Sequence, residues 1–265
     1  MLYGIDISSW QEGIDIPQIA TQIDFMICKC TDGLYFKDNP FEDFMQAGSD
    51  NNLLLGMYHF AENQSPTRQA DYFYKACKDW IGRAIPFLDL EDDNIQDWEN
   101  FATQFCERFE SLSGVRPILY ISNGYTERFS KQFSLKYNLW VAEYWYANVK
   151  NFTYLRWADW PETAPWPDAL MWQFTSAGKL KGFDGNLDLD YFYGNRGDWE
   201  SLTEGVDMAI SDDDIERIAK RCAEYIYGDK DKERNLNMYN AVHWGFNNTE
   251  TILDMLKVIS DKING

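Results

Sequence analysis

The chain has 265 residues, a length that suits one large domain with a small appendage or two modest domains. Its formal net charge is −19, so it offers no basic surface to neutralise phosphate groups, and composition argues against nucleic acid and against an anionic membrane as partners. Aromatic residues make up 17% of the chain, an excess that is typical of a sugar-binding cleft, although a rich core also accounts for many of them.

The chain begins with MLYGIDISSW, which has neither the basic stretch nor the long apolar segment of a secretory signal. We therefore expect synthesis in the cytoplasm without a signal peptide. No apolar run approaches the roughly 20 residues that span a bilayer. The five cysteines lack the spacing of metal ligands, and we expect them to be reduced thiols that pack as small apolar residues.

Eight short segments have the apolar composition of β-strands, and they begin at Leu2, Phe25, Leu53, Ile85, Pro117, Leu139, Leu170 and Asn186. Helix-like stretches separate the early ones, at residues 39–52, 65–82 and 95–114. Strand followed by helix is the pattern of parallel βαβ units. The segment 146–169 has little helical character. We predict an α/β fold, an irregular TIM-like barrel of about eight strands.

The stretch IPFLDLEDD, at residues 85–93, ends an apolar strand in a cluster of carboxylates. Alternation along a strand puts Asp89 and Glu91 on one side and Leu88 and Leu90 on the other. One interpretation is a strand that runs out into a charged loop, which is common. The more specific interpretation is a pair of acids held close together at the mouth of a barrel.

Barrel enzymes carry their active sites at the C-terminal ends of the strands. Polar or aromatic residues recur at that end of the predicted strands, and solvation alone does not require them inside so many apolar runs. The residues expected at this face are Asp6, Lys29, Thr31, Tyr58, His59, Asp89, Glu91, Tyr120, Tyr144, Gln173, Asp188 and Asp190.

Seven motifs in order along the chain resemble the glycoside hydrolase family 25 lysozymes, which are muramidases of bacteria and their phages. They span about residues 2–195 and read GIDISSWQ, FMICKCTDG, GMYHF, PFLDLE, WVAEY, MWQFT and GFDGNLDLDYF. The resemblance implies a catalytic barrel over residues 1–200. It also implies a peptidoglycan hydrolase of the phage endolysin type, which cleaves the β-1,4 bond between N-acetylmuramic acid and N-acetylglucosamine. The chain departs from the family at Asp32, where Glu is usual, and at Asp190, where Asn is common.

The resemblance places the family's acidic residues on Asp6, Asp89, Glu91 and Asp188. Glycosidic cleavage requires an acid that protonates the leaving oxygen and a group that stabilises the oxocarbenium-like centre. We expect Glu91 to be the acid, because neighbouring carboxylates and partial burial raise its pKa. Asp89 is either a direct nucleophile or, as we favour, the group that orients the substrate's own N-acetyl oxygen in a retaining, substrate-assisted reaction. Asp6 and Asp188 are then supporting groups.

Further residues are expected to bind the substrate, and neither a cofactor nor a metal is expected. Lys29 is equally well explained as an ion-pair partner of the acids, and core packing explains each tyrosine nearly as well. With only two histidines, a zinc deacetylase would have too few ligands. The expected substrate-binding residues are Lys29, Tyr58, Phe60, Tyr120, Tyr144 and Gln173.

The remainder of the chain is expected to form a linker at residues 201–210 and a small helical module at residues 211–265, which contains two amphipathic helical patterns. This module weakly resembles the cell-wall-binding repeats of phage lysins, with Tyr239, His243 and Trp244 as its sugar contacts. The alternative is an oligomerisation module through which the chain self-associates. A module of about 55 residues is marginally stable alone.

The expected partner is bacterial peptidoglycan, which the enzyme would reach after its release from the cytoplasm. Two other functions stay open at this point. The first is a non-catalytic peptidoglycan-binding protein on an inactive barrel, which the intact acid set argues against. The second is a hydrolase of another N-acetylated polysaccharide such as chitin, which substrate assistance alone would allow.

Overall fold

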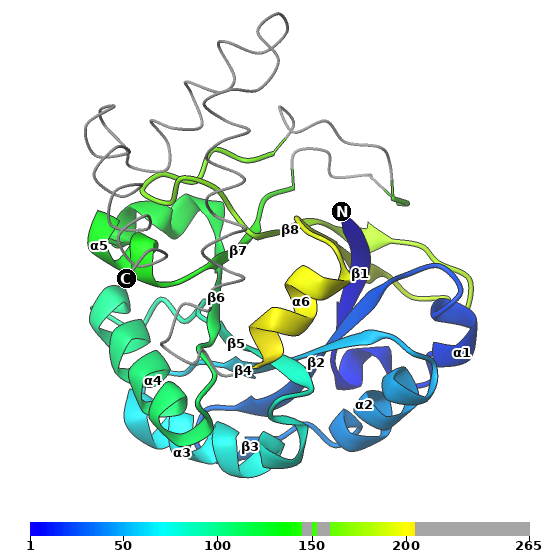
Figure 1. Cartoon of the computed structure of the whole chain (residues 1–265), viewed down its shortest axis with the longest axis horizontal. Coiled ribbons are helices and arrows are strands. Elements are labelled where there is room, and N and C mark those ends of the chain that lie inside the picture. Colours follow the sequence, from blue (N-terminus) through cyan, green and yellow to red (C-terminus); the bar gives the residue numbers. More distant parts are fainter. Residues whose placement is uncertain (145–149, 153–159, 205–265) are drawn as a thin grey trace, which may run out of the picture. The chain divides into compact units, whose positions relative to one another are not determined.

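The structure, a computed structural model, describes residues 1–144, 150–152 and 160–204 (Figure 1). Within these residues, eight strands form a closed barrel, because β1 pairs with both β9 and β2 at the two ends of the sheet. The barrel strands are β1 (Leu2–Ile7), β2 (Phe25–Asp32), β4 (Leu54–Phe60), β5 (Ala84–Asp89), β6 (Ile118–Ser122), β7 (Leu139–Ala142), β8 (Met171–Gly178) and β9 (Leu187–Phe192). All eight correspond to predicted segments, and the predicted TIM-like barrel is confirmed.

The short strand β3 (Phe36–Lys37) was not predicted, and it pairs antiparallel with the end of β2. Two residues give no alternation for sequence analysis to detect. The pairing of β3 with β2 brings the aromatic ring of Phe36 beside the mouth of the barrel, where the ammonium group of Lys29 lies 5.8 Å from the ring centroid.

The last strand, β9, runs antiparallel to both of its neighbours, whereas β1, β2 and β4 to β8 are parallel. The expectation that Asp188 lies at the C-terminal end of a strand is therefore wrong. Asp188 is the second residue of β9, and it reaches the mouth of the barrel because the strand enters there and descends. Its Cα atom is paired with that of Asp6 on β1.

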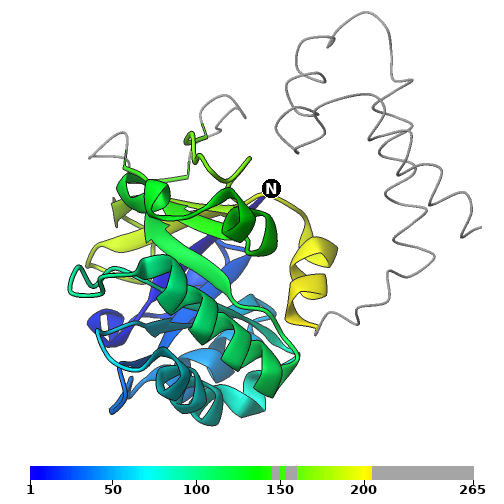
Figure 2. The same cartoon turned by 90° about the vertical axis from the view of Figure 1, so that its left-hand side faces the viewer.

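Helices cover the outside of the barrel, as the two views in Figures 1 and 2 show. The three predicted helices are confirmed as α2 (Phe41–Asp50), α3 (Pro66–Cys77) and α4 (Trp98–Ser113). The shorter α-helices are α1 (Ile16–Ile19), α5 (Lys131–Lys136) and α6 (Arg196–Thr203). The 3₁₀ helices are η1 (Ser9–Gln11), η2 (Lys78–Trp80) and η3 (Asn123–Arg128). Helix α4 begins where the Asp97 carboxylate accepts a hydrogen bond from the Asn100 amide, and it ends at Gly114, whose φ is +75°. No helix in the described ranges is long and apolar enough to cross a membrane.

Alternation along the strands divides the apolar side chains between two cores. In β5, Phe87 belongs to the core inside the barrel, whereas Leu88 and Leu90 belong to the core between barrel and helices. Asp89 therefore continues the inward face of Phe87 at the point where the strand ends. The four described cysteines are buried free thiols. The apolar patterning thus fixes the direction in which the catalytic candidates point.

Helix α6 closes the barrel at the end opposite the mouth. The Trp199 side chain is fully buried, its ring lies 4.6 Å from the ring of Phe25 and 5.1 Å from that of Phe192, and its indole N–H donates to the Leu55 carbonyl. The helix ends at Thr203, so the first three residues of the predicted linker are helical. The helices predicted within 211–265 lie outside the described residues.

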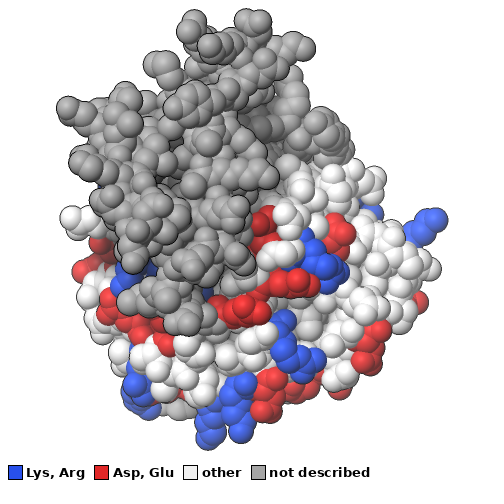
Figure 3. Space-filling view, viewed as in Figure 1, with Lys and Arg blue, Asp and Glu red and all other residues white. Residues whose placement is uncertain are grey.

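Charged side chains of both signs are interspersed on the described surface, and Figure 3 shows this for one face. Basic side chains lie next to acidic ones, for example Arg108 with Asp71 at 2.6 Å and Lys136 with Glu107 at 2.8 Å. Because these pairs are exposed, each contributes at most about 1 kcal/mol to stability. The stability of the barrel depends instead on its two apolar cores.

We predict that Trp199→Ala lowers the free energy of unfolding by about 3–5 kcal/mol, because it empties the space that the indole fills at the closed end of the barrel. Urea denaturation, followed by circular dichroism, measures the change. The matched control is Trp10→Ala, since the Trp10 side chain is 88% exposed and its loss leaves no cavity. Equal stability of the two variants would show that α6 does not support the barrel.

Candidate active site

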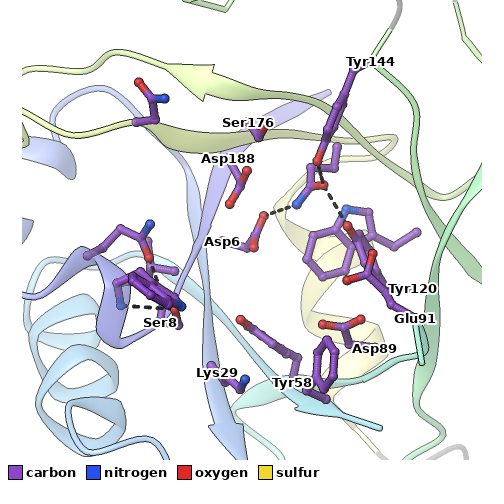
Figure 4. Close-up of a pocket in the computed structure, with 17 residues that line it drawn as sticks. Asp6, Ser8, Lys29, Tyr58, Asp89, Glu91, Tyr120, Tyr144, Ser176 and Asp188 are labelled. Carbon is purple, nitrogen blue, oxygen red and sulfur yellow. Dashed lines mark hydrogen bonds between the residues drawn. The ribbon is translucent and has the colours of Figure 1, made fainter. Parts of the chain in front are cut away.

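A cavity of about 480 Å³ opens at the mouth of the barrel, where the parallel strands end (Figure 4). It brings together all ten residues that the sequence analysis proposed for catalysis and substrate binding: Asp6, Lys29, Tyr58, Phe60, Asp89, Glu91, Tyr120, Tyr144, Gln173 and Asp188. They come from β1, β2, β4, β5, β6, β8 and β9 and from the segments that follow β5 and β7. Residues from most of the chain therefore converge on one site.

Gln173 is the centre of a hydrogen-bond network in this cavity. Its side-chain oxygen accepts hydrogen bonds from the hydroxyl groups of Tyr120 at 2.8 Å and Tyr144 at 2.5 Å, and its Nε2 donates to Oδ2 of Asp6 at 2.6 Å. Gln173 and Tyr120 are only 3% and 7% exposed. These two residues thus orient Asp6 more than they offer surface to a substrate, whereas Tyr144 is 44% exposed and remains accessible.

Asp6 and Asp188 form a like-charge pair across two antiparallel strands. Directly paired residues have Cβ atoms about 4.5–5.5 Å apart, and like charges in this arrangement repel. Burial is the main cause that raises the pKa of Asp6 to about 6, against hydrogen bonds that lower it. Burial, followed by repulsion from Asp6 and Glu91, raises the pKa of Asp188 to about 8. At neutral pH the pair therefore holds a proton.

Asp89 is 8% exposed, and its Oδ1 atom receives no hydrogen bond from the described part of the protein. Burial, followed by repulsion from Glu91 and Asp6, raises its pKa well above the ordinary value. A buried carboxyl oxygen without a donor is costly unless a partner arrives. One oxygen of the Asp89 carboxyl thus has no donor within the described part of the site.

Glu91 follows β5 and lines the same cavity as Asp89, as the alternation of the sequence predicts. Its side chain is exposed to solvent on one side. Removal of water on the cavity side raises the pKa of the Glu91 carboxyl above its ordinary value. A carboxyl group that is both accessible and proton-retaining has the two properties that a general acid requires.

Lys29 forms its ion pair with Asp32 at 2.7 Å, and its ammonium group lies 4.8 Å from the centroid of the Phe60 ring. Of the two roles left open for Lys29, the structure supports an ion pair, but with Asp32 instead of one of the four acids. Asp32 is one of the two positions where the chain departs from the family motif. The Tyr58 ring lines the cavity, and burial raises the pKa of its phenol well above the ordinary value, so the hydroxyl stays protonated.

His59 lies at the C-terminal end of β4 but belongs to the core. Its Nδ1 is 2.8 Å from the hydroxyl of Thr31 and its Nε2 is 3.0 Å from the side-chain oxygen of Gln69. Burial lowers the pKa of His59 to about 4, so the ring is neutral. The described residues contain no group of three or more side chains that could hold a metal ion. His59 is therefore a structural residue.

The sequence analysis missed several residues that line the cavity, namely Ile7, Ser8, Trp10, Gln11, Trp140, Ser176 and Asn186. Among the described residues, Trp10 has the most exposed of the large apolar side chains. It lies in the turn η1, where the Ser8 hydroxyl and the Gln11 side chain form a capping box. The only signal that could have found it was its place in the motif GIDISSWQ, because a single aromatic residue in a turn has no periodicity.

The sequence of the chain also matches a known protein family. The sequence profile described as "Glycosyl hydrolases family 25" matches residues 5–183. The chain belongs to this family. The match covers most of the barrel, and it includes Asp6, Asp89 and Glu91 but ends before Asp188.

Three relatives of the chain have sequence identities of 25–26%. The uncharacterized protein YegX of Escherichia coli K12 is 26% identical over 215 residues, which cover 77% of this chain and 74% of the relative. Lysozyme M1 of Streptomyces globisporus is 25% identical over 215 residues, which cover 72% of this chain and 68% of the relative. The N,O-diacetylmuramidase of Arthroderma benhamiae is 26% identical over 208 residues, with 70% and 83% covered.

A solved structure shows the same fold. The bacterial lysozyme of Streptomyces coelicolor aligns with a TM-score of 0.65 and covers 76% of this chain and 96% of its own. Its sequence identity to this chain is 21%. The barrel fold is therefore shared although about four of every five aligned residues differ.

The Asp6–Asp188 pair predicts a pH-dependent stability. Because the pKa of Asp188 is about 8 in the fold and 3.8 otherwise, the folded protein keeps a proton that the unfolded chain releases, and native stability falls as pH rises through this window. We predict that Asp188→Asn removes part of this loss. Its gain in unfolding free energy should be absent near pH 4 and on the order of 2 kcal/mol near pH 8, after allowance for solvent screening.

Urea denaturation of wild type and variant across this pH range measures the gain. Asp184→Asn, which removes an exposed carboxylate outside the cavity, controls for the general loss of negative charge. If Asp188→Asn is stabilising to the same extent at every pH, then Asp188 does not hold a proton in the folded protein.

Proposed function

We propose that this protein is an N-acetylmuramidase that cleaves the β-1,4 bond between N-acetylmuramic acid and N-acetylglucosamine in peptidoglycan. The observation that carries the proposal is the pair Asp89 and Glu91 at the end of β5, which lines a cavity together with Asp6 and Asp188 in a family 25 barrel. Curated relatives of this chain are named as a lysozyme and as an N,O-diacetylmuramidase. These names support peptidoglycan hydrolysis, and the bond cleaved is the finer part of the proposal.

Glu91 is the proposed general acid that protonates the leaving glycosidic oxygen. This role requires a carboxyl group that still holds its proton at the working pH and that can reach solvent and substrate. The raised pKa of Glu91 and its position at the open edge of the cavity support it. After the first step the same carboxylate would act as the base that activates water, as microscopic reversibility requires in a retaining reaction.

Asp89 is the proposed partner of the substrate's N-acetyl group. In a substrate-assisted reaction the acetamido oxygen attacks the sugar's anomeric carbon, and a carboxylate that accepts the amide N–H makes that oxygen a better nucleophile. The buried Asp89 carboxyl has an oxygen without a donor in the described structure, which supports this role.

Asp6 and Asp188 are the proposed supporting acids. Gln173 fixes one oxygen of Asp6, and the repulsion between the two acids keeps a proton in the site. That proton limits the negative charge that Glu91 and Asp89 face. The tyrosines at positions 58 and 144 provide hydroxyl groups and ring faces at the rim for the sugar.

We further propose that the protein acts as a wall-lysing enzyme of the phage endolysin type, which reaches peptidoglycan after release from the cytoplasm. The weak resemblance of residues 211–265 to wall-binding repeats supports this biological role. In this proposal the barrel carries the chemistry and the C-terminal residues add affinity for the wall, with self-association as the alternative. Expression in a host cell with and without a protein that permeabilises its membrane tests the release step.

We predict that Glu91→Gln abolishes hydrolysis, because it removes the transferable proton but little volume. The loss should be at least the roughly 10²–10⁴-fold that is typical of general acid catalysis. Release of reducing ends from purified peptidoglycan measures it. The control is Glu127→Gln, which changes an exposed residue of η3 outside the cavity.

The same assay with chitin distinguishes the other functions. Cleavage of chitin but not of peptidoglycan would make the protein a hydrolase of another N-acetylated polymer. Binding of both without cleavage by the wild type would make it a carbohydrate-binding protein. Near-normal turnover by a folded Glu91→Gln protein would remove Glu91 from the role of acid.

We also predict how salt and truncation affect wall binding. A protein with net charge −19 gains no attraction to anionic wall polymers, and added salt screens repulsion beyond about 8–10 Å, so moderate salt should leave binding unchanged or strengthen it. Truncation after Glu204 should weaken binding while the barrel still cleaves soluble fragments. Pull-down of both forms on purified walls across a salt series measures these effects. Equal binding by the two forms would assign the C-terminal residues to assembly, and binding that collapses with salt would contradict the electrostatic argument.

A further inference from the structure

Asp190 is a buried acid beneath the cavity that the proposed reaction does not use. It lies on β9 two residues after Asp188, on the same face and one pleat further into the barrel. Its side chain is fully buried, and it is not among the residues that line the cavity. The chain register pairs it with Gly4 on β1 and with Gln173 on β8.

Only one oxygen of Asp190 has a fixed donor. The indole N–H of Trp140 donates to Oδ1 at 2.9 Å. Oδ2 is buried and receives no hydrogen bond from an N–H group or a hydroxyl in the described part of the chain. An ionised carboxylate in this position would leave its second oxygen unsatisfied, which is costly in a buried site.

The strand register places Asp190 diagonally across from Asp6 on the same face of the sheet, because Asp6 is paired with Asp188 and Asp190 lies two residues further along β9. Asp190 is also paired with Gln173, whose amide contacts Asp6, and the two acidic side chains interact with each other. Two carboxylates cannot hydrogen-bond to each other, because both are acceptors when ionised. A hydrogen bond forms only if one of them carries a proton. Asp6 already accepts a hydrogen bond from the amide of Gln173, which favours the ionised form of Asp6 and leaves Asp190 as the donor.

We propose that Asp190 is a neutral carboxylic acid in the folded protein, and that its Oδ2–H donates to the Asp6 carboxylate and holds it in place. Asp190 is then a positioning residue, because it acts through Asp6 and does not line the cavity. Its protonation state is a property of the fold alone, whereas its effect on turnover rests on the proposed hydrolysis.

The charges around Asp190 are consistent with a neutral acid. The titratable groups that face it are Asp6 on β1, Asp188 on its own strand and Tyr144 after β7, while Glu91 after β5 faces Asp6. None of these is a cation. Burial, followed by repulsion from Asp6 and Asp188, raises the pKa of Asp190 well above its ordinary value.

Infrared difference spectroscopy of the full-length protein tests the protonation state without any substrate. The spectrum of wild type minus Asp190→Asn at neutral pH should contain the C=O stretching band of a protonated carboxyl group. If the difference contains only the bands of an ionised carboxylate, the proposal is wrong. Trp140→Phe should retain the protonated band, because the lost indole donor stabilises the ionised form of Asp190 more than the neutral form.

The pH profile of kcat/KM on peptidoglycan fragments tests the positioning role. Asp190→Asn should leave the acidic limb of the profile in place, since it exchanges one neutral donor for another. Asp190→Leu removes the donor to Asp6, so the acidic limb should move to higher pH and kcat/KM should fall by roughly 10- to 100-fold, the effect of losing a hydrogen bond to a charged group.

Opposite results overturn the proposal in distinct ways. An acidic limb that moves to lower pH in Asp190→Asn would show that the substitution removed a negative charge and that Asp190 is ionised in the wild type. An unchanged profile in a folded Asp190→Leu protein would show that Asp190 does not position Asp6. If Asp190→Leu does not fold, the infrared spectra and the Asp190→Asn profile decide. If the wild type cleaves no peptidoglycan, the proposed function fails, while the infrared result still decides the state of Asp190.

Discussion

Burial of four carboxyl groups in one cavity, reinforced by repulsion among them, is the constraint on which the site depends. Asp6, Asp89, Glu91 and Asp188 line the same cavity, and each has a raised pKa. They cannot all be ionised together, so the site retains protons at pH values where free carboxyl groups would have lost them. A general acid requires such a retained proton. Burial of the two apolar cores offsets the free-energy cost of placing these acids close together.

The antiparallel strand β9 creates that constraint. A parallel final strand would have placed Asp188 at the closed end of the barrel, beside α6, and the mouth would have held three acids instead of four. Because β9 enters at the mouth and pairs with β1, Asp188 lies directly opposite Asp6. The direction of one strand thus determines the number of acids in the cavity and places Asp188 opposite Asp6.

Local patterns were sufficient to predict much of this architecture. Alternation in IPFLDLEDD placed Asp89 and Glu91 on one side and Leu88 correctly against the outer helices, because that pattern reflects burial directly. The direction of β9 could not be predicted in the same way, since an antiparallel strand and a parallel one have the same alternation. Asp188 was therefore placed in the site for the wrong structural reason. The roles of Gln173 and Trp199 were also out of reach, because they depend on partners distant in sequence, such as Tyr120 for Gln173 and Leu55 for Trp199.

The site holds its acids with neutral donors, and this choice preserves their protons. Asp6 is held by the amide of Gln173, which two tyrosine hydroxyls orient, and the one lysine at the rim is paired with Asp32. A cation beside Glu91 would favour its ionised form and lower its pKa. The carboxyl group would then be ionised at neutral pH and could not donate a proton. Amide and hydroxyl donors fix geometry at a smaller cost in pKa than a full positive charge. The barrel can therefore position four acids closely and still keep one of them able to act as an acid.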